Sequence, residues 1–514
     1  MISRRDLLHA VGAGGLSAVL PTRMVSQRPQ RADDTLTLTT TVAGTGYYAY
    51  LPFDVPAGVD RIDVTMRHSQ PAKLGVGLFD WRGAGYQSSG FRGVYGDERS
   101  DFFVATDVAS PSFLPGPIQP GTWTVIVPVF QAPPLTVVTV TVTLRSGLAR
   151  GAFRPDPIQG VVRDAPGWYR GDLHCHTPES SDAWATGSAM TAAEWAATCR
   201  RIGLDFVALT DHNVVSQNLH LARDAEPGVL FLAGEEMTNW FHGHATVSGL
   251  LDPTGWLDWR QRPLGVPTRP NEGRIIDFLR TAHQLGAYVS AAHPMLAHVA
   301  WQFFTDAVAD RAARPDGIEV WSGQFRPDSE ATLKLWDGLL REGWRIPANG
   351  GSDLHGTDNP YGLVAGTPTT VVYAERLERG ALVDALRAGR SYITRVPDGV
   401  ELELGAEGPG GQHERAGAVI YGAAADLAHV ELIVRRAAGM RLIVTVGGQQ
   451  WPAQPITEDS QTFTLRVPIA AGYVRAEVRS LPEVPARTPL SGRTDMEALT
   501  NPIYLRSGRS PDGS

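Results

Sequence analysis

The sequence predicts an α/β protein in which a parallel sheet, closed or nearly closed into a barrel, is flanked by two β-rich segments. Three observations lead to this prediction. Between residues 168 and 395, short apolar segments alternate with amphipathic helical segments, as in a series of βα units. Residues 32–150 and 399–507 instead show the alternation that is typical of strands. Finally, His, Asp and Glu recur where the central strands end, which is the face that carries the chemistry in βα barrels.

Length and composition limit the classes to which the protein can belong. A chain of 514 residues corresponds to about three domains, and its 43% hydrophobic and 19% charged residues are ordinary for a globular protein. The net charge of −8 does not favour a nucleic acid as a partner. Cys175 and Cys199 are the two cysteines, which excludes a disulfide framework and a zinc–thiolate motif.

The first 31 residues have the features of an export signal. The paired arginines Arg4 and Arg5 precede a short, weakly apolar run that ends near Leu20. Paired arginines indicate the twin-arginine route, so we expect residues 1–31 to lie outside the fold and the protein to be periplasmic or secreted. No other apolar run reaches the roughly 18 residues that span a bilayer, so no integral membrane segment is expected after signal removal.

Residues 32–150 are predicted to form an N-terminal β-sandwich domain. Strand-like runs separated by Pro and Gly turns are Thr35–Val42, Arg61–Met66, Trp123–Val127 and Val137–Leu144. We expect this domain mainly to pack against the rest of the chain. Binding of substrate or of a surface is the alternative.

Residues 168–395 are predicted to hold the barrel. Thr191 and Glu194 form a capping box that opens a helix, and Gly203 ends it. Further helices are expected from Glu272 to Leu285 and from Asp328 to Glu342. The strands expected after the first helix are Asp205–Leu209, Val229–Leu232, Ala245–Val247, Ala287–Ala292, Gly317–Trp321 and Ile346–Asn349.

Residues 399–507 are predicted to form a C-terminal β domain, because helical periodicity disappears again. The strand-like runs are Glu401–Leu404, His429–Val434, Leu442–Val446, Thr462–Val467 and Tyr473–Val478.

Imidazole and carboxyl groups lie at the ends of successive predicted barrel strands. His174 and His176 are two residues apart in an extended segment, so their rings point to the same face. The whole set is His174, His176, Asp182, Asp211, His212, Glu235, Glu236, His242, His244, His293, Asp353 and His355. Each residue alone could be a helix cap or a solvated side chain, but so many strand ends in one barrel are difficult to explain in that way. Together these groups suit Zn, Mn or Fe rather than a thiolate site.

The segments DLHCHT, TDHN, GEEM, GHA, AAHP and GGSDLHG occur in this order along the chain. In order and spacing they resemble the PHP family, named for polymerase and histidinol phosphatase, over about residues 168–395. The chain is most similar to the exported branch that includes carbaryl hydrolases, and Tyr473–Val478 and Thr500–Tyr504 add to that likeness. The resemblance implies a distorted, TIM-like (β/α)7 barrel, here flanked by the two β-sandwich-type domains, with two or three divalent metal ions.

The resemblance also implies ligands for each metal. The first metal would be held by His174, His176, Asp353 and Glu236. Glu236 would bridge to the second metal, which His244 and His293 would complete.

Asp182, His212 and His355 would surround a third metal, although Asp182 stands where many members of the family have His. A metal-bound hydroxide would carry out the hydrolysis together with His355, Asp353 and His212.

Three further residues are expected to support the ligands or to contact the substrate. The spacing from Gly234 favours Glu236 over Glu235 as the ligand, and neighbours on a strand point to opposite faces. Asp211 is expected to orient a ligating imidazole, with a turn role as the alternative. His242 shares the parity of His244 and could reach the rim of the site.

The predicted reaction is metal-assisted hydrolysis of a small-molecule ester. Phosphomonoesters or phosphodiesters are the expected substrates from the resemblance, and a carbamate or carboxylic ester is the rival. The chain contains no Ser-His-Asp or activated Cys arrangement, so no covalent intermediate is predicted. A phosphatase should bring Arg or Lys to the site, and by sequence the nearest candidates are Arg326 and Arg390. A metal-containing binding protein without catalysis is the non-enzymatic alternative.

Overall fold

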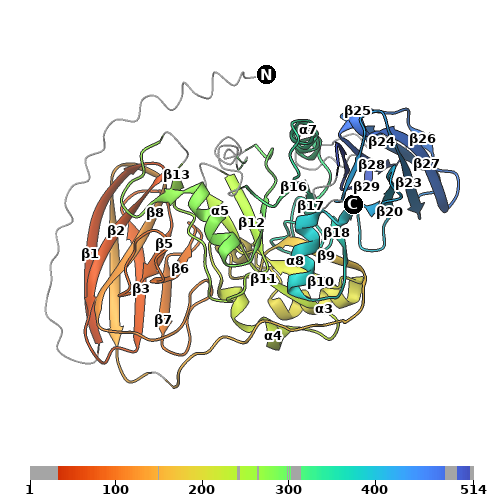
Figure 1. Ribbon diagram of the computed structural model, residues 1–514. Coiled ribbons are helices and arrows are strands. Elements are labelled where there is room, and N and C mark those ends of the chain that lie inside the picture. The colour runs from red at the N-terminus through yellow and green to blue at the C-terminus, as the bar shows by residue number, and fades with distance from the viewer. Residues whose placement is uncertain are drawn as a thin grey trace.

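The computed structural model describes residues 33–148, 150–239, 243–262, 266–297, 299, 301, 314–480 and 495–509. The expected export segment and His242 lie outside these ranges. Figure 1 shows the N-terminal strands on one side, the C-terminal strands on the other and the central α/β part between them. Within the described ranges, no helix is both long enough and apolar enough to cross a bilayer.

The N-terminal strands form an eight-stranded sheet, called here the N-terminal sheet, around the long strand β8 (Gly121–Arg145). The first half of β8 pairs with β2 (Tyr47–Val55), β4 (Lys73–Leu74) and β5 (Val76–Phe79). Its second half pairs with β1 (Asp33–Gly44) and β3 (Arg61–His68). β6 (Phe91–Tyr95) then pairs with β5, and β7 (Asp101–Ala105) pairs with β3. Pro133 and Pro134 lie where β8 changes partners, because proline lacks the N–H that a continuous ladder needs. The strands expected for residues 32–150 are therefore present, while the limits of a separate domain stay a prediction.

A nearly closed, barrel-like sheet forms the centre of the molecule. Its strands, in spatial order, are β9 (Gly167–Cys175), β10 (Phe206–Leu209), β11 (Leu230–Asn239), β12 (Gly243–Ser248), β15 (Tyr288–Ala291), β16 (Gly317–Ser322) and β17 (Ala348–Gly351). The segment after β17 returns to β9, where Asp353 N donates to His174 O at 2.8 Å and His176 N donates to Leu354 O at 3.1 Å. The two ends of the sheet therefore meet beside the two histidines.

The barrel is not a regular succession of βα units. β12 runs antiparallel to β11 and to β15, while the other neighbouring pairs are parallel. Only residues 240–242 separate β11 from β12, which is too short for the crossover that parallel strands need. The structure therefore shows a mixed α/β, strand-rich barrel in place of the expected regular alternation.

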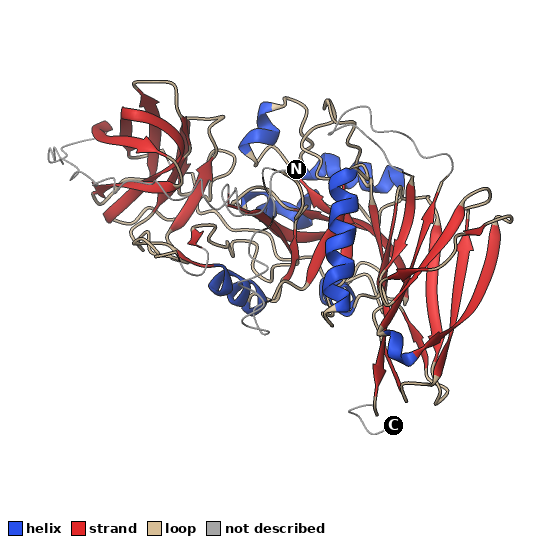
Figure 2. Cartoon of the chain, turned by 90° about the horizontal axis from the view of Figure 1, so that it is seen from above, coloured by secondary structure: helices blue, strands red, loops and turns tan. Residues whose placement is uncertain are grey.

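The helices pack around this sheet, and Figure 2 shows them mainly over the middle of the molecule, with strand-rich parts at both ends. They are α2 (Ser181–Ala185), α3 (Ala192–Ile202), α4 (Leu221–Asp224), α5 (Ile275–Gln284), α7 (Pro327–Arg341) and α8 (Arg379–Ala388). The capping box at Thr191 is confirmed, and Gly203 ends α3 in the left-handed conformation. The helix expected from Glu272 begins only at Ile275, because β14 (Gly273–Arg274) first pairs with β13 (Gln261–Arg262).

Strand β9 pairs with different partners along its length. Its first half pairs antiparallel with β18 (Thr369–Ala374), and its second half meets the segment after β17. From β18 the same sheet continues through β19 (Ser391–Thr394), β29 (Met496–Thr500), β28 (Tyr473–Arg479) and β24 (Arg441–Val446). A separate four-stranded sheet contains β20 (Glu401–Glu407), β21 (His413–Arg415), β23 (Leu427–Arg435) and β27 (Ser460–Pro468). Many of the expected C-terminal strands therefore extend the sheet of the barrel.

The remaining short strands are β22 (Val419–Gly422), β25 (Gln449–Gln450), β26 (Gln454–Pro455) and β30 (Ile503–Ser507). β30 lies between β22 and β28, so the last described strand joins two earlier ones.

Candidate metal centre

Side chains from six strands of the barrel, or from the segments that follow them, meet at one end of the sheet. All of the ligands expected from the sequence belong to this group: His174, His176, Asp182, His212, Glu236, His244, His293, Asp353 and His355. Several of these residues form clusters whose potential ligand atoms lie within 4.8 Å of one another. The sequence motifs therefore converge in space.

The first of three groups contains four donor atoms. His174 Nε2 lies 3.3 Å from Glu236 Oε2 and 3.3 Å from Asp353 Oδ1. His176 Nε2 lies 3.4 Å from each of the same two oxygens. Nitrogen and oxygen ligands about 2.0–2.1 Å from a tetrahedral zinc are themselves about 3.3 Å apart. These four atoms therefore have the mutual spacing of a ligand set around one cation.

The second group is built on the other oxygen of Glu236. Its Oε1 lies 2.8 Å from His244 Nδ1 and 3.3 Å from His293 Nε2. The two oxygens of one carboxylate thus face two different sets of imidazoles. This is the arrangement that a bridging ligand requires.

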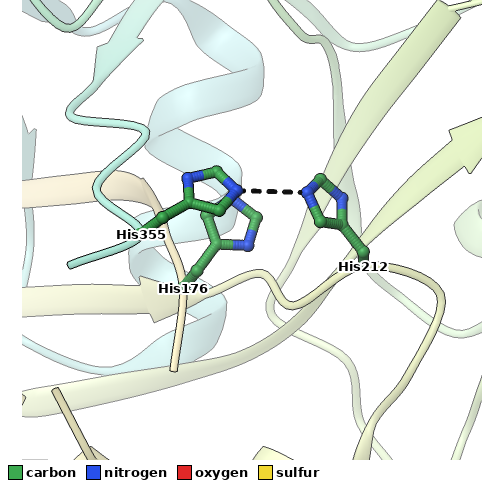
Figure 3. A group of neighbouring side chains, drawn as sticks. All are labelled: His176, His212 and His355. Atoms are coloured by element: carbon green, nitrogen blue, oxygen red, sulfur yellow. Dashed lines mark hydrogen bonds between the residues drawn. The ribbon is translucent and has the colours of Figure 1, made fainter. Parts of the chain in front are cut away.

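The third group is a triangle of donors on the side of the barrel mouth. Asp182 Oδ2 lies 3.2 Å from His212 Nε2 and 3.2 Å from His355 Nε2, and the two nitrogens are also 3.2 Å apart. Figure 3 shows these nitrogens facing each other, with the ring of His176 stacked against that of His355 at a centroid distance of 3.9 Å. The three equal edges match the spacing of three ligands of one cation.

Unpaired buried atoms show that these donors fit a cation. Three atoms of the first group, His174 Nε2, His176 Nε2 and Glu236 Oε2, are buried and make no hydrogen bond. A buried polar atom without a partner costs about 1–3 kcal/mol, so a cluster of them indicates a partner that is not a protein group. Imidazole nitrogen and carboxylate oxygen are ligands of Zn, Mn and Fe, so the residues present fit a divalent metal.

Backbone strain marks two of the ligand positions. Asp353 has a φ of 53° and His293 a φ of 27°, values that residues other than glycine seldom adopt. Such conformations cost about 1–3 kcal/mol and persist where the surroundings impose them. Here the backbone N–H of Asp353 donates to His174 O, and the backbone N–H of His293 donates to the side-chain Oε2 of Glu319, each at 2.8 Å.

Glu319 is a residue of the site that the sequence reasoning missed. It lies in β16, where it is almost fully buried, and its Oε1 is 3.0 Å from His174 Nδ1. By bonding Nδ1, Glu319 fixes the ring so that Nε2 points at the first group. The available indication was a lone acid inside the apolar run Gly317–Trp321.

Asp172 was missed as well, and it is buried below the centre. Its carboxylate accepts hydrogen bonds from the backbone N–H groups of His174, Ser352 and Gly366. Burial raises the pKa of Asp172. The residue joins β9 to the loop before Asp353.

Asp211 is located beside the cluster, but its hydrogen bonds go to a loop. Asp211 Oδ1 accepts from Thr177 N at 2.8 Å and from Ser180 N at 3.0 Å, and Oδ2 accepts from Thr177 Oγ1 at 2.9 Å. Burial raises the pKa of Asp211 to about 7. These contacts favour the turn role over direct orientation of an imidazole, since Asp211 holds the loop that joins His176 to Asp182.

Glu235 and Glu236 point in opposite directions, as adjacent residues of a strand must. Glu235 Oε2 accepts a hydrogen bond from Leu257 N at 2.8 Å, away from the histidines. Burial raises the pKa of Glu235 well above its usual value. The described contacts of Glu235 therefore give it no part in the cluster.

Two expectations concern residues outside the cluster. Cys175 and Cys199 are both buried and do not form a disulfide. In the helical pattern His283 shares the apolar side with Ile276 and Leu279, which predicts a core position, but it is partly exposed and lies 3.2 Å from Asp316. Asp316 directly precedes β16, and hydrogen bonds to Val289 of β15 bring it within reach, which the helical pattern alone does not show.

The electrostatics of the cluster follow from burying acids among imidazoles. Burial raises the pKa of Asp353, but the imidazoles around it, first His174, bring that pKa well below its usual value. Glu236 behaves in the same way, and its pKa is also well below its usual value. Burial lowers the pKa of His176 to about 3, whereas Asp182 overcomes the effect of burial on His355 and raises its pKa to about 9. Anionic carboxylates thus stand beside at least one neutral imidazole, as metal ligation requires.

The chain has partial likenesses among solved structures. No family model matches the chain, and no curated protein matches it. Among solved structures, the chain is similar to a protein from Bifidobacterium adolescentis that is provisionally described as a metal-dependent phosphoesterase, with 18% identity, a TM-score of 0.28, and coverage of 38% of this chain and 90% of that one. It is also similar to an amidohydrolase from Chromobacterium violaceum with bound sulfate and no metal, with 20% identity, a TM-score of 0.27, and coverage of 36% of this chain and 87% of that one. Neither likeness is close enough to establish a function, which has to be inferred from the side chains themselves.

Proposed function

We propose that the protein is an exported, metal-dependent hydrolase that cleaves an ester bond and belongs to the PHP-like class that its ordered motifs resemble. The observation that carries this proposal is the convergence of donors from β9, β11 and β17 at the spacing of metal ligands. The (β/α)7 description of the barrel and the export through residues 1–31 belong to the same proposal.

The exposure of the centre favours catalysis over a purely structural role. The side chains of His174, His176 and Glu236 are 0% exposed, whereas those of Asp182 and His355 are 36% and 26% exposed. Structural metal sites are closed, while catalytic sites keep an open position. The third group is therefore the side from which a substrate would enter.

The chain supplies ligands and proton carriers. His174, His176, Glu236 and Asp353 would hold the first metal, and the second and third groups would hold the others. Divalent cations bound there would lower the pKa of a water and polarise a substrate oxygen, which makes hydrolysis possible near neutral pH.

Two side chains at the mouth are placed to move protons. The carboxylate of Asp353 is 19% exposed, so it can accept the proton of the attacking water. Where the third group holds no metal, the imidazole of His355, whose Nε2 lies 3.2 Å from Asp182 Oδ2, can donate a proton to the leaving oxygen. His212 Nε2 lies at the same distance from Asp182 and can take the same role.

The surroundings of the third group favour an ester with little negative charge. The described residues that line the cavity beside Asp182 and His212 include no Arg or Lys. A phosphomonoester dianion calls for such a residue, because Arg pairs with phosphate through two parallel hydrogen bonds. Arg326 instead pairs with Asp328, and Arg390 lines a separate surface pocket. We therefore favour phosphodiesters and carbamate or carboxylic esters over phosphomonoesters.

The decisive experiment combines metal analysis with turnover. The purified full-length chain is assayed for bound metal and for hydrolysis of 4-nitrophenyl phosphate, bis(4-nitrophenyl) phosphate and 1-naphthyl methylcarbamate, before and after chelation and metal restoration. We expect hydrolysis of the second or third compound that disappears on chelation and returns with metal. Bound metal without turnover of any ester would support the binding-protein alternative. Turnover that survives complete metal removal would contradict the proposal.

A further inference from the structure

The N-terminal sheet packs directly against the barrel beside the metal centre. Val94 at the end of β6 belongs to the same apolar core as Met237 of β11. Phe91 of β6 stacks on Trp256 with a centroid distance of 4.2 Å and contacts Trp259 at 5.6 Å. The edge strand of the N-terminal sheet is thus fixed relative to the ligands.

The same sheet holds the loop that carries Asp182. Ser181 Oγ accepts a hydrogen bond from Gly96 N at 2.9 Å and donates one to Glu98 Oε2 at 2.7 Å. A Cβ at position 96 would lie 2.9 Å from Ser181 Oγ, so the glycine permits this close approach. Glu179, two residues before Ser181, accepts hydrogen bonds from the backbone N–H and the hydroxyl of Ser112, which lies in the N-terminal segment as well.

This loop is therefore held from two sides. On the inner side, Asp211 binds the backbone of Thr177 and Ser180. On the outer side, Gly96 and Glu98 bind Ser181, the residue directly before Asp182. The position of Asp182 relative to His212 and His355 depends on both contacts.

A small cavity lies between the N-terminal sheet and the third group. Its volume is about 40 Å³, and it is lined by Asp182 and His212 on one side and by Val94, Pro128 and Phe130 on the other. One water needs about 10–15 Å³ by this measure, so the cavity has room for about three waters. Apart from Glu98, whose carboxylate accepts the hydrogen bond of Ser181, the residues of the N-terminal sheet that line the cavity carry no charge, which suits an uncharged group better than an ionic one.

We propose that the N-terminal sheet forms part of the substrate-binding site. Val94, Pro128 and Phe130 wall a cavity that receives the small uncharged organic group of the ester and excludes longer ones. Gly96 and Glu98 act as positioning residues, since they hold Asp182 through Ser181. This inference rests on the proposed ester hydrolysis for its substrate, but not for its geometry.

Shortening Phe130 tests the size limit of the cavity. The substrates are 4-nitrophenyl acetate and 4-nitrophenyl hexanoate, or methyl and hexyl 4-nitrophenyl phosphate if the protein cleaves phosphodiesters. Phe130→Ala should raise the kcat/KM for the longer substrate, relative to that for the shorter one, at least tenfold. Phe103→Ala is the matched control, because Phe103 is a similarly half-buried ring of the same sheet that packs against Arg61. Equal kcat/KM ratios in Phe130→Ala and Phe103→Ala would show that Phe130 does not limit the size of the substrate.

Removing the Ser181 hydroxyl tests the positioning role without relying on turnover. Ser181→Ala should bind one cobalt ion fewer per chain than the wild type, or bind that ion at least tenfold more weakly. The visible absorption of the bound cobalt(II) should change as well. Ser181→Thr, which keeps a hydroxyl, should restore the binding. Ser69→Ala is the control, because Ser69 Oγ accepts a hydrogen bond from Val137 N of β8, and neither residue is among those that line the cavity beside Asp182. Identical cobalt binding by Ser181→Ala and Ser69→Ala would refute the positioning role.

The two proposals can fail separately. If the wild-type chain binds cobalt but cleaves no ester, the proposed hydrolysis is wrong, while the cobalt comparison still decides the role of Ser181. In that case the wall is tested by titrating the cobalt spectrum with acetate and hexanoate. If the wild type binds acetate more tightly than hexanoate and Phe130→Ala loses this preference, the result supports Phe130 as a wall of the cavity. If the wild type binds both acids equally, the result contradicts it.

Discussion

Glu235 and Glu236 are adjacent on β11, yet their carboxyl groups lie in different surroundings. Glu236 faces the imidazoles, which lower its pKa, whereas burial raises the pKa of Glu235 beside Leu257. We expect Glu236→Gln to lose metal and at least 100-fold in kcat/KM, because the bridging anion is gone. Glu235→Gln should keep its metal, because the amide oxygen can accept the same hydrogen bond from Leu257 N and the side chain lies away from the imidazoles. Metal analysis of both purified variants checks this, and equal metal loss in the two would contradict the assignment.

Glu319 should tune the centre although it holds no metal itself. Glu319→Gln keeps the shape of the side chain but weakens its hydrogen bond to His174 Nδ1. Losses of about 10–100-fold in metal affinity are typical when such a partner is changed. Competition with a chromophoric chelator measures the effect. An affinity equal to that of Glu235→Gln would show that Glu319 does not orient the ring.

Asp353 should be indispensable for both metal and turnover. Asp353→Ala removes an oxygen that lies 3.3–3.4 Å from His174 and His176, so metal content and activity should fall together. The partly exposed pair of His283 and Asp316 offers a control, since exposed pairs contribute about 0–1 kcal/mol. His283→Ala should therefore leave both quantities unchanged. Full turnover in Asp353→Ala would show the ligand assignment to be wrong.

Individual ligands were easier to predict than the residues that support them. His174 and His176 stand in a motif, and their two-residue spacing puts both rings on one face of a strand. Glu319 and Asp172 have no such local pattern. Their roles depend on β16 and on the loop before Asp353 coming next to β9, which is a tertiary relation.

At the scale of elements, β28 and α7 are joined by buried charges. Arg475 is 1% exposed and pairs with Asp337 of α7 at 2.6 Å and with Glu477 at 3.1 Å. We expect Arg475→Ala to destabilise the protein by about 3–5 kcal/mol, because Asp337 loses its arginine and the buried Glu477 is left with Arg479 alone. Denaturant unfolding followed by tryptophan fluorescence measures this change.

The control for that experiment is an exposed ion pair. Arg435 of β23 is 40% exposed and pairs with Glu401 and Glu403, so Arg435→Ala should cost only about 0–1 kcal/mol. Similar losses in the two variants would mean that the β28–α7 contact contributes little.

Local patterns predicted many elements but not how they are joined. The alternation of Thr with Leu in β1 and with Val in β8 is local, as is the capping box of α3, and each is present in the structure. The antiparallel direction of β12 is not local, since it depends on the three-residue connection after β11. The double pairing of β9 was also unpredictable, because β18 and the segment after β17 approach it from distant parts of the chain.

At the scale of the whole molecule, metal should stabilise the fold. The cluster joins β9, β11, β12 and β17, and a ligand that binds only the folded state at 100 times its Kd adds about 2.7 kcal/mol. Chelation should therefore lower the Tm by several degrees, and restored metal should recover it. Differential scanning calorimetry of the wild type and of Asp353→Ala checks this. A chelator effect of equal size in both proteins would show that it does not come from this cluster.

The position of β29 between β19 and β28 has a consequence for biosynthesis. Met496–Thr500 fills the gap between two strands that are translated earlier, so the sheet has an open interior until this segment leaves the ribosome. A nascent chain halted before Met496 exposes two unpaired backbone edges, which are templates for aggregation. Under the proposed twin-arginine export, a translocase that accepts folded proteins would therefore receive this chain only after Met496–Thr500 has been made.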